Sequence, residues 1–306
     1  MAKKLRISIV QYLNTAPLVY GFTHGPLKGK YELSFTIPSQ CAEDLRERRA
    51  DVAIIPAIEL QRIDGLVVLP NLAIAAKRRV RSLLIVSRKP IEAVQTIALD
   101  RSSRSTQALT RILCAEHWHI SPQFCEASFT PATMLEKTDA ALLIGDPALR
   151  LAISMANYAT LGAAGELVCD AGKIGVNATG PLHVYDVAQQ WRRLSGLPAV
   201  LAVWATRRES LTAEVLADFA ASKEYGCANI PEITAAAAEG LGLPVADLLT
   251  YLGENIHYTL GPDDLAGLEL YYYLAAKLGL IPEANPIEWA GITVDPRRPS
   301  ASSAAS

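Results

Sequence analysis

The residues best suited to chemistry lie in a hydroxyl-rich run at residues 100–106. This run contains Ser103, Arg104, Ser105 and Thr106 and leads directly into a pattern typical of a helix. Backbone N–H groups and the dipole at a helix N-terminus favour an anion, and hydroxyl and guanidinium groups add further donors. The run therefore predicts a carboxylate site. Ordinary helix capping is the alternative, although a single serine suffices for that role.

A second polar turn, at residues 11–18, follows an apolar strand and presents Tyr12 and Asn14. The asparagine amide both donates and accepts hydrogen bonds, so it can hold a hydroxyl or assist a leaving group. Asparagine also simply tolerates the backbone angles of a turn, and taken alone this simpler interpretation is favoured. A third turn contains Gly145, which permits close approach of the backbone, and Asp146, which we expect to cap the next helix.

Metal and cofactor chemistry has little support in the sequence. His117 and His119 stand at a helix end, and no third or fourth ligand is spaced with them. The chain has no glycine-rich nucleotide-binding motif, and its five cysteines show neither CxxC spacing nor an evident base partner. We therefore expect no metal and no cofactor.

The overall composition favours a protein that binds a small molecule. The 306 residues carry 29 Lys plus Arg against 31 Asp plus Glu, a net charge of -2, so no basic surface for nucleic acid or membrane is expected. No segment approaches the roughly 20 apolar residues of a membrane helix. The apolar run at residues 7–10 is too short for a signal peptide, and the odd number of cysteines fits a reducing compartment, so we expect a cytoplasmic protein.

Strand and helix patterns alternate and recur along the chain. The expected strands are apolar at consecutive positions, as in a parallel sheet that helices cover on both faces. Residues 51–56 and 139–145 echo each other, and two similar α/β lobes would explain the repeat. The first unit has strands at residues 6–10, 33–37 and 52–55 with a helix capped by Ser39, and the second has strands at 97–99 and 140–144 with a helix at 107–118.

Two long apolar strands, at residues 82–86 and 199–205, bracket the second unit and are expected to carry the chain between the lobes and back. Lobe one then comprises residues 1–87 and 200–294, and lobe two comprises residues 88–199. This α/β arrangement leaves a central cleft, and ligands of open α/β sheets bind in such a crevice.

The last third of the chain has a different character. Residues 211–280 show helical patterns that should pack back onto lobe one. Residues 295–306 contain Pro, Arg, Ser and Ala without periodicity, so we expect a disordered tail.

A set of short segments occurs in a specific order, at residues 12–18 (YLNTAPL), 41–56, 98–100 with 103–106 (SRST), 143–146, and 196–198 with 202–205. Their combination resembles the chorismate dehydratase family of the futalosine route to menaquinone. The match runs from about residue 6 to residue 205, and beyond residue 206 it is mostly in helix pattern. The resemblance implies the two-lobed fold of type II periplasmic binding proteins. It also implies a hydro-lyase that dehydrates chorismate to 3-[(1-carboxyvinyl)oxy]benzoate, the first step of that route.

The resemblance also implies roles for individual residues. Asn14 would lie at the reacting centre, while Ser103, Arg104, Ser105 and Thr106 would hold a substrate carboxylate. The protein is expected to act on chorismate as a monomer or homodimer. The other residues expected to contact the substrate are Tyr12, Ser82, Gly145 and Asp146.

One position departs from the family pattern. Arg48 stands where the family commonly has glycine, three residues before Asp51. The difference affects a helix end and questions the local geometry there, not the chemistry.

No base that could remove a proton from chorismate is evident. The candidate turns contain no histidine, and Glu59 and Asp146 are the only nearby carboxylates. We hypothesise that catalysis rests on positioning and desolvation, with the enolpyruvyl carboxylate of the substrate taking the proton and Asn14 assisting the hydroxyl. Closure of the lobes is expected to expel water.

Two other functions stay open. A non-catalytic protein that binds a small carboxylate would have the same fold, but neither a signal peptide nor a lipid-attachment cysteine is seen near the start. The related dihydroxynaphthoate synthase also shares the fold, and the turns at residues 12–14 and 103–106 favour the dehydratase over it.

Overall fold

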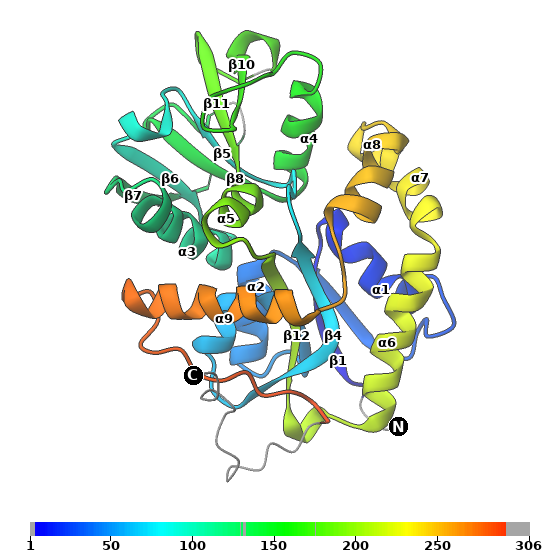
Figure 1. Ribbon diagram of the computed structural model, residues 1–306. Helices are drawn as coiled ribbons and strands as arrows, with labels where there is room; N and C mark the ends of the chain where they lie inside the picture. Colours follow the sequence, from blue (N-terminus) through cyan, green and yellow to red (C-terminus); the bar gives the residue numbers. More distant parts are fainter. Residues whose placement is uncertain (1–3, 129, 131–132, 175, 292–306) are drawn as a thin grey trace, which may run out of the picture.

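Two β-sheets organise the chain into two lobes, which lie one above the other in Figure 1. The computed structural model describes residues 4–128, 130, 133–174 and 176–291, so the tail expected at residues 295–306 lies outside the described residues. The sheet of lobe one has the strand order β2-β1-β3-β12-β4. Its strands are β1 (Arg6–Val10), β2 (Glu32–Thr36), β3 (Val52–Pro56), β4 (Leu66–Ala76) and β12 (Ala199–Arg207).

The sheet of lobe two has the strand order β7-β6-β8-β5-β11-β10-β9. Its central strands β8 and β5 are buried at every residue, because helices cover the sheet on both faces. The strands are β5 (Leu83–Ser87), β6 (Thr96–Asp100), β7 (Gln123–Ala127), β8 (Ala140–Ile144), β9 (Thr160–Leu161), β10 (Leu167–Asp170) and β11 (Pro181–Asp186).

The repeat expected from the sequence is present in both sheets. β1 pairs in parallel with β2 and β3, and β6 pairs in parallel with β7 and β8. The aspartates that precede β3 and β8 make the same contact. Asp51 accepts a 2.8 Å hydrogen bond from the N–H of Arg6, and Asp139 accepts bonds of 2.9 and 3.2 Å from those of Gln95 and Thr96. The echo between the two segments therefore reflects equivalent places in equivalent units.

Each sheet also contains one antiparallel strand that follows a crossing from the other lobe. β5 pairs with β8, and β12 pairs with β3. We expected β5 to be part of lobe one, within residues 1–87. Its hydrogen-bond partners are β8 and β11, so β5 belongs to lobe two. The first crossing lies at residues 77–82, before β5, and not within residues 82–86. The crossing strands also make both sheets mixed and not purely parallel.

Helices cover the sheets, and those of the last third pack on lobe one as expected. α1 packs against α6 and α7, α2 packs on β1 and β3, and α9 packs on β12 while also contacting α3 of lobe two. The α-helices in the described part of the chain are α1 (Ala16–Thr23), α2 (Pro38–Arg46), α3 (Arg104–Ile112), α4 (Gly145–Met155), α5 (Val187–Ser195), α6 (Ala213–Ala228), α7 (Ile230–Leu241), α8 (Val245–Thr250) and α9 (Pro262–Lys277). The expected helix at residues 107–118 is α3 followed by a π-helical turn (Leu113–His117), and α2 has Ile37, not Ser39, as its N-cap.

A close contact between α1 and α6 fixes the turn at residues 11–18. A Cβ atom on Gly226 would lie 1.9 Å from the carbonyl oxygen of Pro17, and one on Gly21 would lie 2.6 Å from Cα of Ser222. Only glycine permits this approach. The start of α1 is therefore held rigidly against the C-terminal helices.

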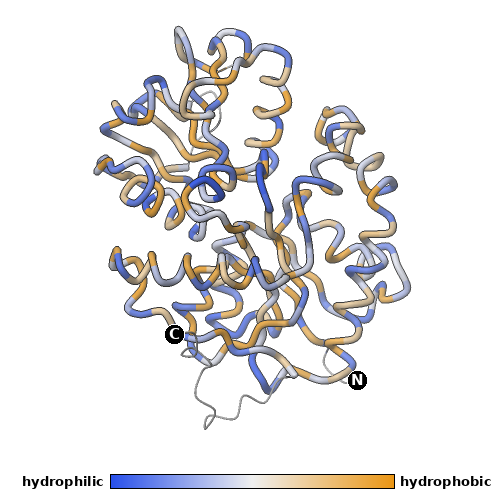
Figure 2. The backbone as a smooth tube through the Cα atoms, viewed as in Figure 1, coloured by the Kyte–Doolittle hydropathy of each residue, from blue (hydrophilic) through white to orange (hydrophobic). Residues whose placement is uncertain are grey.

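The hydrophobic core consists of buried residues from the strands and helices of both lobes. In Figure 2 the strand segments are coloured mainly as hydrophobic. In lobe one, the ring of Phe219 lies 4.9 Å from that of Phe22 and 4.8 Å from that of Trp204, both at steep interplanar angles. Such edge-to-face pairs link α6 to α1 and β12. Within the described ranges, no helix has the length and apolar character needed to span a bilayer.

Candidate functional site

A small cavity of about 50 Å³ lies between the lobes. Lobe one contributes the turn before α1, which includes the 3-10 helix η1 (Leu13–Thr15), and lobe two contributes the first residues of α3 and α4. The structure thus brings six of the nine predicted site residues together. Those six are Tyr12, Asn14, Ser103, Ser105, Thr106 and Gly145, and the apolar walls are Val10, Pro38, Pro56, Ile74, Leu83, Ile144, Leu201 and Ala202.

The hydroxyl-rich run forms the N-terminus of α3. Ser103 is the N-cap, but its side chain makes no capping bond to the helix. Its hydroxyl instead donates to that of Thr106 at 2.8 Å, in a buried position. The hydroxyl of Ser105 accepts a 3.1 Å bond from the backbone N–H of Ile58 in lobe one. Ordinary capping by the Ser103 side chain therefore does not account for these hydroxyls.

The Arg104 guanidinium is engaged by two carboxylates of lobe one. Its guanidinium donates to Glu43 at 2.6 Å and to Glu59 at 3.0 Å, both in lobe one, and Arg104 does not line the cavity. Glu59 is fully buried and also contacts Arg46 at 2.6 Å and Arg62 at 3.0 Å. Its carboxylate is consequently engaged by three guanidinium groups.

Asn14 is held from two sides. The hydroxyl of Thr15 donates to Oδ1 of Asn14 at 3.3 Å. Tyr251, in a π-helical turn of lobe one (Tyr251–Asn255), is its second neighbour. Burial raises the pKa of the Tyr251 hydroxyl, and hydrogen bonding with Ser82 and Asn14 opposes that rise. Tyr251 thus connects Asn14 to the crossing segment that contains Ser82.

Ser82 supports the site without lining the cavity. It is fully buried, and its hydroxyl accepts a 2.8 Å bond from the hydroxyl of Tyr251. Its carbonyl oxygen accepts a 2.8 Å bond from the N–H of Gly145. Sequence reasoning missed Tyr251, because no motif surrounds it and its partners lie more than 160 positions away in the chain.

The ring of Tyr12 in lobe one packs closely against the backbone of Gly145 in lobe two. Gly145 has a φ of +67°, and a Cβ atom there would lie 2.7 Å from carbons of the Tyr12 ring. Glycine is thus required both for its backbone angle and for the close approach. Burial raises the pKa of the Tyr12 hydroxyl, and hydrogen bonding to Ser102 opposes this rise.

Asp146 caps a helix, but not the one that was expected. Its Oδ1 accepts a 3.1 Å bond from the N–H of Leu13, the first residue of η1, while the N-cap of α4 is Ile144, without a side-chain cap. The expectation that Asp146 caps its own helix is therefore wrong. Burial raises the pKa of the Asp146 carboxyl, and the bond from Leu13 partly offsets this.

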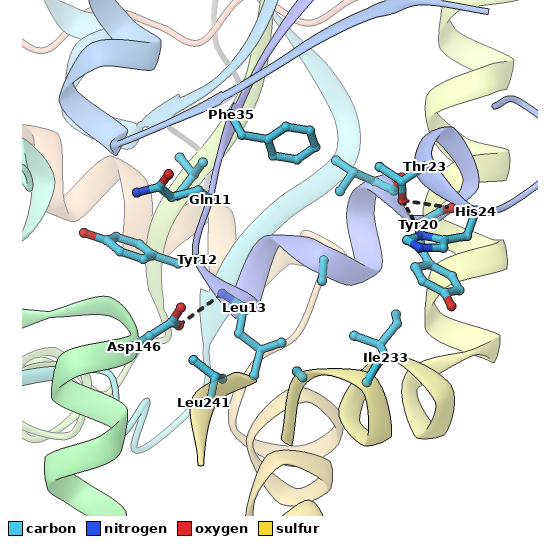
Figure 3. A pocket seen from close by; sticks show the side chains of 15 residues that line it. Gln11, Tyr12, Leu13, Tyr20, Thr23, His24, Phe35, Asp146, Ile233 and Leu241 are labelled. Carbon is cyan, nitrogen blue, oxygen red and sulfur yellow. Dashed lines mark hydrogen bonds between the residues drawn. The ribbon is translucent and has the colours of Figure 1, made fainter. Parts of the chain in front are cut away.

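A larger groove of about 470 Å³ adjoins the cavity and shares Val10 and Tyr12 with it. Figure 3 shows Leu13 and Asp146 at one end of this groove and Tyr20 and His24 at the other. Phe35 and Ile233 form apolar parts of its walls. Tyr12 therefore lines both the groove and the cavity.

Metal-ligating side chains are not gathered anywhere in the part of the chain that the structure describes, where no group of three or more His, Cys, Asp or Glu could hold an ion. All five cysteines are free thiols. His117, one of the two histidines noted at a helix end, lies 3.2 Å from Gln190.

Two mixed sheets with a cavity between them define the class of proteins with the periplasmic-binding-protein fold, as expected. Among solved structures, the periplasmic aliphatic sulphonate binding protein of Escherichia coli is 16% identical with a TM-score of 0.57, and the match covers 98% of this chain and 97% of that one. A protein of Archaeoglobus fulgidus is 19% identical with a TM-score of 0.68, covering 91% and 98%. Likeness at this level of identity concerns the fold alone.

The family itself follows from the sequence. Residues 5–277 match the family model described as menaquinone biosynthesis, so the chain belongs to this family. A relative from Thermus thermophilus named chorismate dehydratase is 26% identical over 276 residues, which cover 90% of this chain and 95% of the relative. The family resemblance carried by the short segments is thereby confirmed.

Proposed function

We propose that the protein is a cytoplasmic hydro-lyase that dehydrates chorismate to 3-[(1-carboxyvinyl)oxy]benzoate. Membership of the menaquinone biosynthesis family and likeness to a chorismate dehydratase support this substrate. The observation that carries the proposal is the chemistry of the cavity wall. Hydroxyls and one amide line the cavity, while no carboxylate, imidazole or amine is found among the described residues that line it.

Such a wall suits a dianion that supplies its own base. In the reaction, the C3–H bond of the ring breaks, the C4 hydroxyl leaves, and the proton and hydroxide depart as water. The C3 position is conjugated with the ring carboxylate, so donors on that carboxylate stabilise the charge that develops there. Formation of an aromatic ring supplies the driving force.

In this proposal the two lobes bind different parts of chorismate. The ring carboxylate binds at the N-terminus of α3, where backbone N–H groups and the hydroxyls of Ser103, Ser105 and Thr106 are available. Asn14 donates to the departing C4 hydroxyl from lobe one. Tyr12 covers the ring from the side of the groove. Gly145 forms part of the wall, Asp146 holds the turn at Leu13 in place, and Ser82 supports Gly145 through its carbonyl oxygen.

The proton acceptor is the enolpyruvyl carboxylate of the substrate. Neither nearby protein carboxylate is suited to the role, because Glu59 contacts three arginines and Asp146 accepts the N–H of Leu13. A carboxylate tethered to C3 through the ether has a large effective concentration at the proton that it removes. The protein then needs only to hold the tether in the reactive arrangement.

Substrate binding requires the cavity to widen. A volume of about 50 Å³ is far below the roughly 300 Å³ at which ligand pockets begin. The adjoining groove, which shares Tyr12 with the cavity, provides the route of access in this proposal. Closure of the lobes over the bound ring then excludes water.

The test is incubation of the purified protein with chorismate, followed by ultraviolet absorption and proton NMR. The proposal predicts loss of the diene absorption, appearance of an aromatic enol ether, and a fall of about 10²- to 10³-fold in kcat for Asn14→Ala. An unchanged diene spectrum despite tight binding would instead indicate a binding protein. Indifference to chorismate would favour the dihydroxynaphthoate synthase reaction.

A further inference from the structure

A buried carboxylate lies directly behind the proposed substrate loop. Glu59 has no exposed surface, yet its two oxygens contact Arg46 at 2.6 Å, Arg62 at 3.0 Å and Arg104 at 3.0 Å. A charge that is removed from water in this way persists only where paired donors replace the lost hydration. The arrangement therefore holds the three guanidinium groups in fixed places.

The three arginines come from different parts of the fold. Arg46 and Arg62 belong to lobe one, as Glu59 does, whereas Arg104 is the first residue of α3 in lobe two. Arg104 also donates to Glu43 at 2.6 Å, so two carboxylates of lobe one receive a single guanidinium of lobe two. The planar fork of arginine suits this double contact, which a lysine ammonium cannot reproduce.

The neighbouring residues make the same connection. The N–H of Ile58, one residue before Glu59, donates to the hydroxyl of Ser105, one residue after Arg104. The carbonyl oxygen of Ser105 accepts a 3.0 Å bond from the hydroxyl of Tyr271 on α9. Two consecutive residues of the loop are therefore fixed to lobe one, Arg104 by partly buried contacts and Ser105 by buried ones.

We propose that Glu59 is a positioning residue that acts through Arg104 to set the hydroxyls of lobe two against Asn14 of lobe one. This inference rests on the proposed function, because a substrate held at one end by the loop and at the other by Asn14 needs both at a fixed separation. A misplacement of about 1 Å between reacting groups costs on the order of 100-fold in rate. Arg104 itself does not touch the substrate.

A direct role for Arg104 makes the opposite prediction. If Arg104 left Glu59 to bind the substrate carboxylate, loss of the Glu59 charge would release the guanidinium and tighten binding. If Glu59 positions the loop, loss of that charge slows turnover instead. The signs of the two effects differ, so kinetics separates the two roles.

The test compares Glu59→Gln, Arg104→Lys, Glu43→Gln and the double variant Glu59→Gln with Arg104→Lys in the full-length protein. We expect kcat for chorismate to fall at least about tenfold in the Glu59 and Arg104 single variants, with KM changed less than about threefold. The double variant should be no worse than Arg104→Lys alone. Arg62→Lys is the matched control, since it contacts Glu59 within lobe one, and it should stay within about twofold of the wild type.

Two results would overturn the proposal: a lower KM with unchanged kcat in Glu59→Gln, or wild-type kcat in Arg104→Lys. If Glu59→Gln does not fold, Arg104→Lys decides, because Arg104 is partly exposed and the substitution keeps its charge. Unchanged kcat in Arg104→Lys would then contradict the proposal, and a reduced kcat with a normal KM would support it. Glu43→Gln leaves the contact between Arg104 and Glu59 in place and should reduce kcat less than Arg104→Lys does.

Hydrogen exchange gives a readout that does not depend on turnover. Deuterium uptake across residues 101–109 should rise in Glu59→Gln and Arg104→Lys and stay at the wild-type level in Arg62→Lys. Equal uptake in every variant would refute the positioning role. If the variants show this pattern of uptake but the wild type does not convert chorismate, the proposed function fails. The structural link between Glu59 and the loop is then still supported.

Discussion

The backbone N–H of Leu13 in lobe one donates a 3.1 Å hydrogen bond to the carboxylate of Asp146 in lobe two. The contact joins the first residue of η1 to the first turn of α4, so an acid from one lobe caps a helix of the other. Tyr12 and Gly145, the residues just before this pair, are also in contact across the lobes. The two turns that frame the cavity are therefore fixed to each other.

Removing the acceptor should weaken this arrangement. Asp146→Ala strands the N–H of Leu13, and loss of a charge-assisted bond of about 1.5 kcal/mol should lower kcat/KM for chorismate about tenfold. Asp146→Asn keeps an acceptor oxygen and should remain within about threefold of the wild type. Steady-state kinetics of the two variants checks this prediction, and equal losses in both would show that the charge matters and the hydrogen bond does not.

Two buried tyrosines offer a matched comparison. The hydroxyl of Tyr251 bonds Ser82, whereas that of Tyr258 is buried without a hydrogen-bond partner among the described residues. Tyr251→Phe should lower kcat about tenfold with little change in KM, because Asn14 loses its support. Tyr258→Phe should leave kcat unchanged and stabilise the fold by about 1 kcal/mol. Parallel kinetics and thermal melts test both, and equal kcat in the two variants would contradict the role of Tyr251.

Much of the fold could be predicted because it depends on local pattern. Mostly apolar runs indicated β1, β3 and β8, and the repeated aspartate before β3 and β8 indicated two equivalent units. The position of the first crossing was wrong because the apolar sequence of a buried strand is compatible with either sheet. Only its hydrogen-bond partners assign β5 to lobe two.

The site could be predicted in its loops but not in its cross-lobe partners. Hydroxyls at a helix start and a polar turn after a strand are visible in the sequence, and six of the predicted residues line one cavity. That Arg104 pairs with Glu43 and Glu59, and that Asp146 caps η1, depends on how the lobes meet. No spacing in the chain encodes those contacts.

Arg48 shows what a departure from the family pattern means physically. Its φ of +59° lies in the left-handed region, where glycine is favoured, and its ion pair with Glu209 is exposed at both ends. Arg48→Gly should therefore raise the free energy of unfolding by about 0.5 kcal/mol, with unchanged kcat. Arg48→Ala removes the same ion pair and keeps the strain, so it is the control. Chemical denaturation measures both, and a Gly variant no more stable than the Ala variant would argue against strain at this position.

Asp139 should make stability sensitive to acid. Hydrogen bonding to Lys89 lowers the pKa of the Asp139 carboxyl, with further help from the N–H groups of Gln95 and Thr96. Its contribution is therefore complete above the unfolded-state pKa of about 4 and is lost as the pH falls through the lower folded-state value. Asp139→Asn should lose about 1 kcal/mol at pH 7 and show a smaller further loss below pH 4. Melting temperatures measured across pH test this prediction, and Asp64→Asn, at an exposed position, is the control. Parallel curves of melting temperature against pH for the wild type and Asp139→Asn would exclude the linkage.

The pH dependence of kcat for chorismate tests the central claim most directly. If the substrate's own carboxylate removes the proton, no group in the cavity wall titrates near neutrality, since burial raises the pKa of Tyr12 above its usual value. A flat profile of kcat is therefore expected from about pH 6 to about pH 9. An acid limb within that range would identify a protein base, with Asp146 the first candidate, and would contradict the account.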